Sequence, residues 1–500
     1  MERCSGILMP VSALPSPGGI GTLGREAYQF CDFLERAGQR VWQMLPLGPT
    51  SYGDSPYQSF STYAGNPYFV DPELLMEEGL VTREEIDSFP WGDDPARINY
   101  GAIYQSRFTL LRLAFHRGME RELAPFHRFR EENARWLEDY ALFMALKNHF
   151  GMRAWTQWED EAIRLHQGEA LARYRELLRE DVEFYSFVQY LFFRQWDALK
   201  AYAHRHGIRV MGDMPIYVAM DSADVWAGPE NFLLDERNAP IAVAGVPPDY
   251  FSVTGQLWGN PLYRWDRMAE NGYRWWIDRV KGASRLYDAL RIDHFRGFES
   301  YWKVPAGAET AITGEWVKGP GMALISAIQA ACPDVEIIAE DLGFLSDGVR
   351  ALLADSGFPG MKVLEFAFDS REPSNYLPHT YPHHCVCYVG THDNSTVAAW
   401  RQEAAPEDVR MAVEYLGLNQ EEGFHWGMIR GGMSSVANLF VAQMQDYLGL
   451  GAEARMNIPG TLGGNWAWRL LPGQLSEALA ARIRRMAWMY GRLAGENNPE

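Results

Sequence analysis

Short apolar runs that suit β-strands alternate along the chain with longer amphipathic segments that suit α-helices. This alternation predicts a parallel sheet, because parallel strands are joined by long crossovers that are usually helices. The expected strands cover residues 40–45, 208–212, 286–292, 335–339, 361–368 and 385–389. The expected helices cover residues 25–37, 184–206, 272–280, 321–331, 345–356, 433–448 and 475–494.

Three of the apolar runs stop at a short motif in which an acidic residue is followed by a turn. The motifs are Arg291-Ile292-Asp293-His294-Phe295-Arg296-Gly297, Ala339-Glu340-Asp341-Leu342-Gly343 and Gly390-Thr391-His392-Asp393-Asn394. In parallel α/β folds the loops at the carboxyl ends of the strands hold the chemistry, so carboxylates from three strands can meet at one substrate. This pattern favours a closed (β/α)8 TIM barrel over an open sheet, whose ligand sits at one switch point.

Two long stretches interrupt the alternation. Residues 71–183 are rich in Arg, Glu and Trp without a good strand run, and we interpret them as a mostly helical insertion in one barrel loop. Residues 221–265 form an irregular stretch, which we expect to be a loop insertion over the cleft. Irregular segments of this length inside a compact domain are usually functional. We therefore expect a single catalytic barrel over residues 1–500 that carries these two insertions.

Composition narrows the range of partners. Apolar content of 47% and charged content of 22% are ordinary for a globular protein. The formal net charge of −19 makes nucleic acid and anionic membrane surfaces poor partners, because the protein repels phosphate groups. The first residues do not resemble a signal peptide and no segment is long enough to span a bilayer, so we expect a cytoplasmic protein. Five cysteines, an odd number, predict free thiols.

Two other chemistries fit parts of the sequence less well. Residues 19–24 match a dinucleotide-binding Gly pattern, but residues 12–17 lie between them and the preceding apolar run at residues 7–9, so the tight strand-to-helix turn is missing. His383-His384-Cys385-Val386-Cys387 offers soft metal ligands, but no second cluster completes a set of four. We interpret these segments as a Gly-rich turn and as core thiols, and we expect no metal site.

The acidic motifs suit the cleavage of a glycosidic bond with retention of configuration. That reaction needs an ionised carboxylate as nucleophile and a protonated one as acid, with the two groups roughly 5 to 5.5 Å apart. Arg291 precedes Asp293 by two residues on a strand, so both side chains share a face and the guanidinium keeps Asp293 ionised. Glu340 follows the apolar residues Ile337-Ile338-Ala339, which raise its affinity for a proton.

Aromatic residues point to a sugar as the substrate. They make up 13% of the chain and include 18 Trp. Sugar rings stack their C–H faces on flat side chains, while their hydroxyls bond to neighbouring polar groups. Aromatic residues lie beside polar ones in three places: Tyr250 and Trp258 around Gln256 and Asn260, Tyr52 and Tyr57 around Asp54, and Trp466 and Trp468 beside Asn465.

Longer strings occur along nearly the whole chain in the order that one enzyme family shares. They are Leu14-Pro15-Ser16, Ser55-Pro56-Tyr57-Gln58-Ser59, Gly212-Asp213-Met214-Pro215-Ile216, Gly245-Val246-Pro247-Pro248-Asp249-Tyr250-Phe251, Trp258-Gly259-Asn260-Pro261-Leu262-Tyr263 and Asn465-Trp466-Ala467-Trp468-Arg469. On these strings the chain resembles the amylomaltases, which are the 4-α-glucanotransferases or disproportionating enzymes of glycoside hydrolase family 77 in the α-amylase clan.

The resemblance implies a (β/α)8 barrel with inserted subdomains and without a C-terminal all-β domain. It also implies Asp293 as nucleophile, Glu340 as general acid/base and Asp393 as the transition-state stabiliser, with no metal or organic cofactor. Substrate-binding residues follow from the resemblance and from the aromatic clusters: Tyr57, Asp213, Asp249, Gln256, Trp258, Arg291, His294, His392 and Asn465. One departure is visible at Ser395, where many members have a second Asp, and it leaves the local support of that turn open.

The expected reaction is the transfer of α-1,4-glucan segments from a donor to an acceptor glucan or glucose. The partners are then α-1,4-glucans and maltooligosaccharides, and we expect a monomer. Two alternatives remain open. An α-glucan hydrolase can use the same site, because transfer and hydrolysis differ only in which hydroxyl reaches the intermediate. A non-catalytic glucan-binding protein can use the aromatic residues alone.

Overall fold

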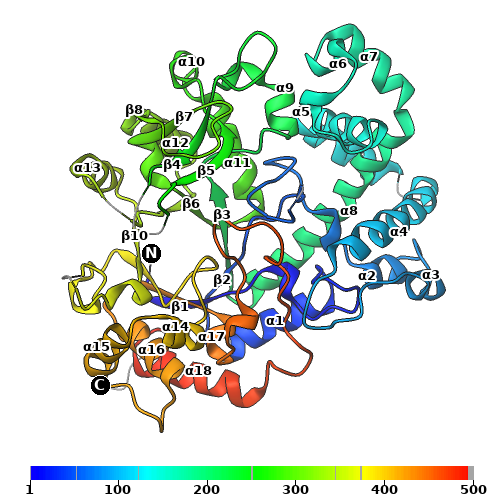
Figure 1. Ribbon diagram of the computed structural model, residues 1–500. Helices are drawn as coiled ribbons and strands as arrows, with labels where there is room; N and C mark the ends of the chain where they lie inside the picture. The colour runs from blue at the N-terminus through cyan, green and yellow to red at the C-terminus, as the bar shows by residue number, and fades with distance from the viewer. Residues whose placement is uncertain are drawn as a thin grey trace.

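Eight parallel strands form the centre of the computed structural model, which describes residues 2–51, 53–121, 123–248, 252–343, 345–371 and 374–493 (Figure 1). Their order around the sheet is β10-β11-β12-β1-β2-β3-β6-β9. Where the two ends of this sheet meet, the Ala339 N–H donates to the Pro359 carbonyl oxygen over 2.9 Å, so the barrel is nearly closed. The strands are β1 (Cys4–Leu8), β2 (Val41–Gln43), β3 (Arg209–Pro215), β6 (Ala289–Asp293), β9 (Glu336–Ala339), β10 (Gly360–Val363), β11 (Cys385–Tyr388) and β12 (Leu439–Gln443).

The predicted TIM-barrel fold is confirmed. Alternate residues of the strands fill the barrel interior, where Leu8, Met211, Ile338, Val386 and Val441 belong to one buried cluster. The residues between them face the surrounding helices and belong to a second, larger core. Burying a side chain of this size contributes about 1.5–3 kcal/mol, which explains why strands of four or five residues are stable here.

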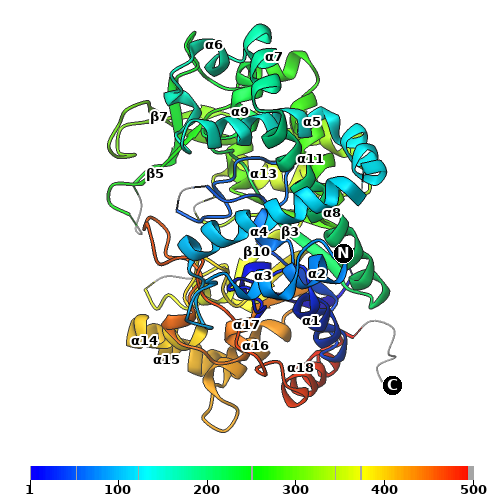
Figure 2. The same cartoon turned by 90° about the vertical axis from the view of Figure 1, so that its right-hand side faces the viewer.

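Helices cover the outside of the barrel, and in both ribbon views α6 and α7 lie at the opposite end of the molecule from α14–α18 (Figure 2). None of the described helices is both long enough and apolar enough to cross a bilayer. The helices that surround the strands are α1 (Arg25–Arg36), α8 (Arg179–Arg205), α11 (Arg274–Leu286), α12 (Met322–Ala331), α13 (Asp347–Ser356), α14 (Val397–Glu403), α15 (Pro406–Leu416), α16 (Phe424–Met433), α17 (Met444–Tyr447) and α18 (Glu477–Met489).

The prediction of a single helix over residues 433–448 is wrong. The structure places the end of α16, the barrel strand β12 and the short helix α17 in this segment. All five residues of β12 are buried and the first four are apolar, so the segment lacks the alternation that distinguishes a strand from a helix. The other strand absent from the prediction, β1, pairs with β12 on one side and β2 on the other, so these two strands complete the barrel.

Residues 71–183 and 221–265, which we expect to be insertions, are mostly helical and partly regular, respectively. The boundaries of the insertions remain predictions. Most of residues 71–183 is helical, and the described helices there are α2 (Pro72–Glu77), α3 (Arg83–Asp87), α4 (Tyr100–Arg121), α5 (Leu123–His149), α6 (Glu161–Arg164) and α7 (Gly168–Leu177). Residues 221–265 contain α9 (Ala223–Ala227) and two strands, so part of this stretch is regular, and α10 (Trp265–Glu270) begins at its end. The strands belong to an antiparallel sheet of order β5-β4-β7-β8, with β4 (Ala242–Val246), β5 (Gln256–Pro261), β7 (Ser300–Pro305) and β8 (Glu315–Lys318).

Candidate active site

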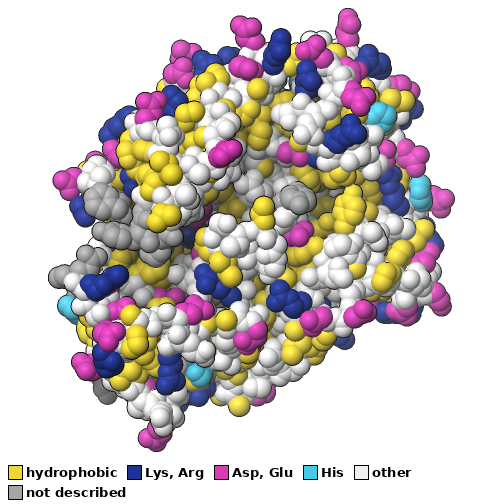
Figure 3. Space-filling model, viewed as in Figure 1, with side chains coloured by type: hydrophobic (Ala, Val, Ile, Leu, Met, Phe, Trp, Pro, Cys, Tyr) yellow, Lys and Arg dark blue, Asp and Glu magenta, His cyan; other side chains and the backbone are white. Residues whose placement is uncertain are grey.

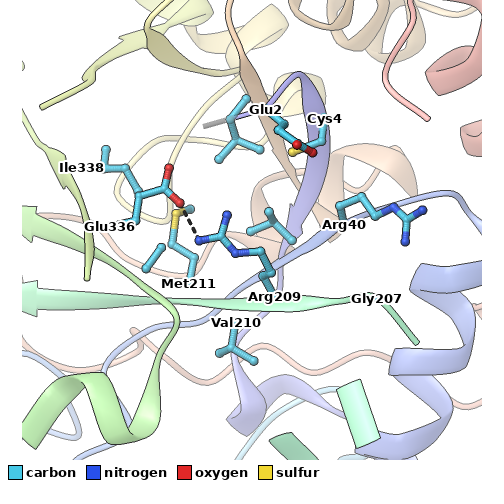
Figure 4. Close-up of a pocket in the computed structure, with 12 residues that line it drawn as sticks. Glu2, Cys4, Arg40, Gly207, Arg209, Val210, Met211, Glu336 and Ile338 are labelled. Carbon is cyan, nitrogen blue, oxygen red and sulfur yellow. Dashed lines mark hydrogen bonds and ion pairs between the residues drawn. The ribbon is translucent and has the colours of Figure 1, made fainter. Parts of the chain in front are cut away.

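The barrel has a large hollow at each end, and of these two hollows only the one at the carboxyl end is lined by predicted catalytic acids. The hollow at the amino-terminal end measures about 600 Å³, and its charged rim contains an ion pair between Arg209 and Glu336 at 2.5 Å above an apolar floor (Figure 4). The cavity at the carboxyl end measures about 820 Å³ and is lined by Asp293 and Asp393, together with Tyr57, Trp258 and other polar and aromatic residues. Figure 3 shows a face that is hollowed near its middle, with hydrophobic side chains gathered around the hollow. The carboxyl end is therefore the candidate active site.

Asp293 ends strand β6 and is held by the guanidinium that the sequence placed on the same face. Arg291 Nη1 lies 3.0 Å from Asp293 Oδ1 and donates to both oxygens of Asp213, at 2.7 and 2.6 Å. Arg291 and Asp213 are buried inside the barrel, whereas the Asp293 side chain is 31% exposed to the cavity. One guanidinium therefore balances two carboxylates and leaves Asp293 accessible to a ligand.

Glu340 follows strand β9, the neighbour of β6 in the sheet. Ile292 pairs with Ala339 in the register, and the Glu340 N–H donates to the Ile292 carbonyl oxygen over 3.0 Å, so Glu340 lies beside Asp293. Its carboxylate accepts from the backbone N–H of His294 at 2.7 Å and of Leu342 at 2.8 Å. His294 has φ of 55°, in the left-handed region, and this turn directs its N–H at Glu340.

The two carboxyl groups differ in their affinity for a proton. Burial, and then the negative charge of Asp293, raise the pKa of Glu340 to about 7, although Arg291 and the two backbone N–H groups oppose the rise. Burial also raises the pKa of Asp293, to about 6, against the opposing charge of Arg291. Both pKa values are raised, and that of Glu340 is the higher, which is the direction that the expected roles of the two residues require. The sequence argument named the apolar approach to Glu340 but not the charge of Asp293.

The third motif follows strand β11 and connects to the first through Tyr57. The Tyr57 hydroxyl donates to Asp213 Oδ2 over 2.7 Å and lies 2.8 Å from His392 Nε2, which in turn lies 3.3 Å from Asp393 Oδ2. Burial opposes a charge on His392, but the neighbouring Asp393 raises the pKa of the ring. Burial opposes ionisation of Asp393 as well, yet the charge of His392 holds the pKa of that carboxyl below its usual range.

Two more of the predicted substrate-binding residues line the cavity beside this network. Trp258 packs edge-on against His294 with ring centroids 4.8 Å apart, and its Nε1 donates to Gln256 Oε1 over 3.2 Å. Burial, with a contribution from Arg296, lowers the pKa of His294 to about 3, so this ring is neutral at ordinary pH. A neutral ring beside an indole offers hydrogen bonds and a flat surface without competing for a charge.

Of the two remaining predicted substrate-binding residues, Asn465 belongs to the described part of the structure and Asp249 does not. Asn465 lines the cavity, but its amide holds its own loop: Oδ1 accepts from the Ile458 N–H, and Nδ2 donates to both oxygens of Thr461. Its contact with a substrate stays a prediction. Asp249 lies outside the residues that the structure describes, as does its neighbour Tyr250.

Sequence reasoning missed Arg455 and Asn457. Asn457 Nδ2 donates to Asp393 Oδ1 over 2.6 Å, and Arg455 Nη2 donates to the Asp393 carbonyl oxygen over 2.8 Å. Arg455 also donates to Ser395 Oγ over 2.9 Å, so the Ser at this position does support the turn. No strand-like run precedes Arg455 and Asn457, and for that reason no periodic signal marked them.

The structure also places the two alternative segments. Strand β1 ends at Leu8 and α1 begins at Arg25, so the Gly residues at 19–24 are not part of a tight strand-to-helix turn. Cys385 and Cys387 are buried free thiols whose side chains belong to the core between the barrel and the helices. Neither segment reaches the cavity at the carboxyl end.

The sequence also matches a known protein family. The family model described as 4-alpha-glucanotransferase of glycoside hydrolase family 77 matches residues 9–475. The chain belongs to this family. The resemblance inferred from the motifs is thereby confirmed, and membership makes the protein an enzyme of the 4-α-glucanotransferase class rather than a non-catalytic binding protein.

Relatives within the 4-α-glucanotransferase family match over nearly their full length. A 4-alpha-glucanotransferase of Thermus thermophilus is 51% identical, over 99% of this chain and 100% of the relative. One of Clostridium butyricum is 49% identical, over 97% of this chain and 100% of the relative. Among solved structures, the amylomaltase from Streptococcus agalactiae in complex with acarbose has a TM-score of 0.96 at 42% identity, over 98% of this chain and 100% of that one.

Proposed function

We propose that this chain transfers α-1,4-glucan segments by a double displacement in which Asp293 is the nucleophile and Glu340 the acid and base. The neighbourhood of the two carboxyl groups on the adjacent parallel strands β6 and β9 is the observation that carries the proposal. Adjacent strands are spaced about 4.8 Å apart, which suits the short separation of a retaining pair.

In the first step Asp293 attacks C1 of the donor sugar with a carboxylate oxygen. The bond between C1 and the glycosidic oxygen breaks, and Glu340 gives its proton to that oxygen as the leaving glucan departs. The higher pKa of Glu340 supports these roles, because the acid needs to keep its proton while the nucleophile is ionised. The product is a glucosyl group bound covalently to Asp293.

In the second step Glu340, now ionised, takes the proton from the 4-hydroxyl of an acceptor glucan. That oxygen forms the new bond to C1, and the bond to Asp293 breaks, so an α-1,4 linkage is restored without net hydrolysis. The chemistry of this scheme uses protons and carboxylates alone and requires no cofactor. Family membership favours transfer over hydrolysis as the outcome.

Asp393 is proposed to bind hydroxyl groups of the sugar on which charge develops. Its ionised state is supported by His392, and its side chain is 41% exposed to the cavity. Gln256, Trp258 and Asn465 supply polar and flat surfaces of the cleft, and His294 packs against Trp258. Tyr57 lines the same cavity and connects His392 to Asp213 and, through it, to Arg291. Because the S. agalactiae amylomaltase is in complex with acarbose, we propose that acarbose binds this cleft too.

Incubation with maltotriose tests the proposal. We expect a ladder of longer maltooligosaccharides together with glucose, whereas shortened products alone would identify an α-glucan hydrolase. Glu340→Gln given α-maltosyl fluoride forms the intermediate without needing an acid, so mass spectrometry should find a maltosyl adduct on the peptide that contains Asp293. An adduct on another residue overturns the assignment. The expected cytoplasmic location and monomeric state remain predictions.

A further inference from the structure

Arg455 and Asn457 hold the turn that carries Asp393. The residues that these segments bring together lie at least 60 positions apart in the sequence, yet four hydrogen bonds join the segments. Asn457 contributes its backbone N–H to the His392 carbonyl oxygen at 3.2 Å and its amide to the Asp393 carboxylate at 2.6 Å. Arg455 contributes the other two, to the Asp393 carbonyl oxygen and to Ser395 Oγ.

The guanidinium of Arg455 also fixes Asn457 itself. Arg455 Nε donates to the Asn457 carbonyl oxygen over 2.8 Å, so one planar group bonds to both the turn and the residue that grips the carboxylate. A rigid fork with several donors can do this, whereas the point charge of a Lys cannot satisfy three acceptors in fixed directions. Arg455 is only partly exposed and Ser395 is buried, which limits competition from water.

Ser395 connects Arg455 to a residue at the surface of the protein. Its hydroxyl accepts from Arg455 and donates to the Glu403 carboxylate at the end of α14. Glu403 is an exposed residue, so water competes with Ser395 for its carboxylate and this hydrogen bond contributes little net stabilisation. The orientation of Asp393 therefore depends mainly on Arg455 and Asn457.

Asp393 needs such support because its side chain is more exposed than that of Asp293. Its side chain is 41% exposed, and a carboxylate that is free to change rotamer cannot meet hydroxyl groups in one fixed geometry. Only Asn457 and His392 contact its two oxygens among the described residues, with Asn457 the closer. Loss of Arg455 frees both the Asn457 carbonyl and the backbone of Asp393.

We propose that Arg455 is a positioning residue for this reaction, which acts through Asn457 and the 391–395 turn to hold the Asp393 carboxylate in its working orientation. The inference rests on the role of Asp393 in the proposed function. It predicts that Arg455 affects turnover more than substrate affinity, and that its effect disappears when Asp393 is no longer a carboxylate.

A double-mutant cycle tests this, with α-maltosyl fluoride as donor and maltose as acceptor so that slow variants remain measurable. Arg455→Met should lower kcat by about 30-fold while KM changes by less than about threefold. The reason is that a misplaced Asp393 stabilises the transition state less but affects the binding of the ground-state substrate little. In an Asp393→Asn background the same substitution should lower kcat by less than about twofold, since the two residues act as one unit. Arg455→Lys, which keeps the charge, should lose about five- to tenfold and replaces Arg455→Met in the cycle if that variant fails to fold.

The matched control is Arg430→Met. Arg430 is also half-buried and joins two segments, through Glu422 and the Leu416 carbonyl oxygen, but it lies away from the cleft. It should lower Tm as Arg455→Met does and leave kcat unchanged. The inference about Arg455 is wrong if its substitution lowers kcat equally with and without the Asp393 carboxylate, or if the Arg455 variants keep the parent kcat. Either result leaves the proposed function standing. An Asp393→Asn variant with nearly wild-type turnover overturns the role of Asp393 as well.

Discussion

The hydroxyl group of Tyr57 and the imidazole of His392 meet at 2.8 Å, and this contact fixes a proton. The single hydrogen of the Tyr57 hydroxyl goes to Asp213 Oδ2, so His392 Nε2 must carry the hydrogen that the Tyr57 oxygen accepts. The rings are also stacked, with centroids 5.2 Å apart. A chain of contacts thus runs from Asp293 through Arg291, Asp213, Tyr57 and His392 to Asp393.

Tyr57→Phe should break this chain at one point while it keeps the ring. We expect kcat/KM for maltotriose to fall about tenfold, because His392 Nε2 loses the acceptor that orients it beside Asp393. Tyr174→Phe is the control, since the Tyr174 hydroxyl also donates to a carboxylate, that of Asp160, but in the helical region of residues 71–183. An unchanged kcat/KM in Tyr57→Phe would show that the hydroxyl has no part in orienting His392.

The pH dependence of activity should follow the pair formed by Asp293 and Glu340. Below about pH 6 Asp293 takes up a proton and can no longer attack, and above about pH 7 Glu340 loses the proton that the leaving group needs. We therefore expect kcat/KM for maltotriose to be bell-shaped with its maximum between these values, and each limb belongs to the pair rather than to one residue.

The pH profile of Glu340→Gln with α-maltosyl fluoride as donor separates the acidic limb of the activity curve from the alkaline one. Fluoride leaves without protonation, so the alkaline limb of intermediate formation should vanish while the acidic limb, which reports Asp293, remains. With maltotriose the same variant should lose far more than tenfold in kcat, equivalent to more than about 1.4 kcal/mol of barrier. An alkaline limb that persists with the fluoride donor would assign that ionisation to a group other than Glu340.

The sequence was sufficient to predict those parts of the site that lie on strand ends. Asp293 closes an apolar run, and period-two alternation correctly placed Arg291 beside it, whereas Asp213 was expected only from the family resemblance. Strand β12 could not be predicted, because its uniform burial removes the alternation that identifies a strand. Arg455 and Asn457 were missed for another reason: their partners at 392–395 are distant in sequence, and only the closed barrel brings the two segments together.

Arg291→Lys should disable the site although the charge is retained. A single Nη1 of Arg291 contacts the carboxylates of both Asp213 and Asp293, and an ammonium group on a shorter chain cannot match that geometry. We expect kcat to fall at least about 100-fold and the free energy of unfolding to fall by about 1–3 kcal/mol, because Asp213 stays buried with a poorer partner. Circular dichroism melting and maltotriose assays measure the two effects. Arg209→Lys, in the exposed pair with Glu336, is the control and should change neither.

Asp446 offers a test of stability away from the reacting groups. It follows β12 in α17, its Oδ1 accepts from the Val397 N–H at 2.8 Å, and its buried Oδ2 has no partner among the described residues. Burial raises its pKa to about 7, although the Val397 N–H opposes this. Burial, and then the charge of Asp446, also raise the pKa of Glu365.

The sign of the resulting pH dependence follows from proton binding. Between the unfolded pKa, near 3.9, and the folded value of about 7, the folded state holds a proton that the unfolded state has released, so stability falls as pH rises through this window. Asp446→Asn removes the ionisation and keeps an oxygen acceptor for Val397. Because pH 5 already lies inside this window, the variant should have a higher free energy of unfolding than the parent at pH 5, and the excess should be larger by about 1–3 kcal/mol at pH 8. Asp355→Asn, at an exposed position, is the control. If the difference in Tm between Asp446→Asn and the parent is equal at pH 5 and pH 8, Asp446 is ionised in the folded protein at both pH values.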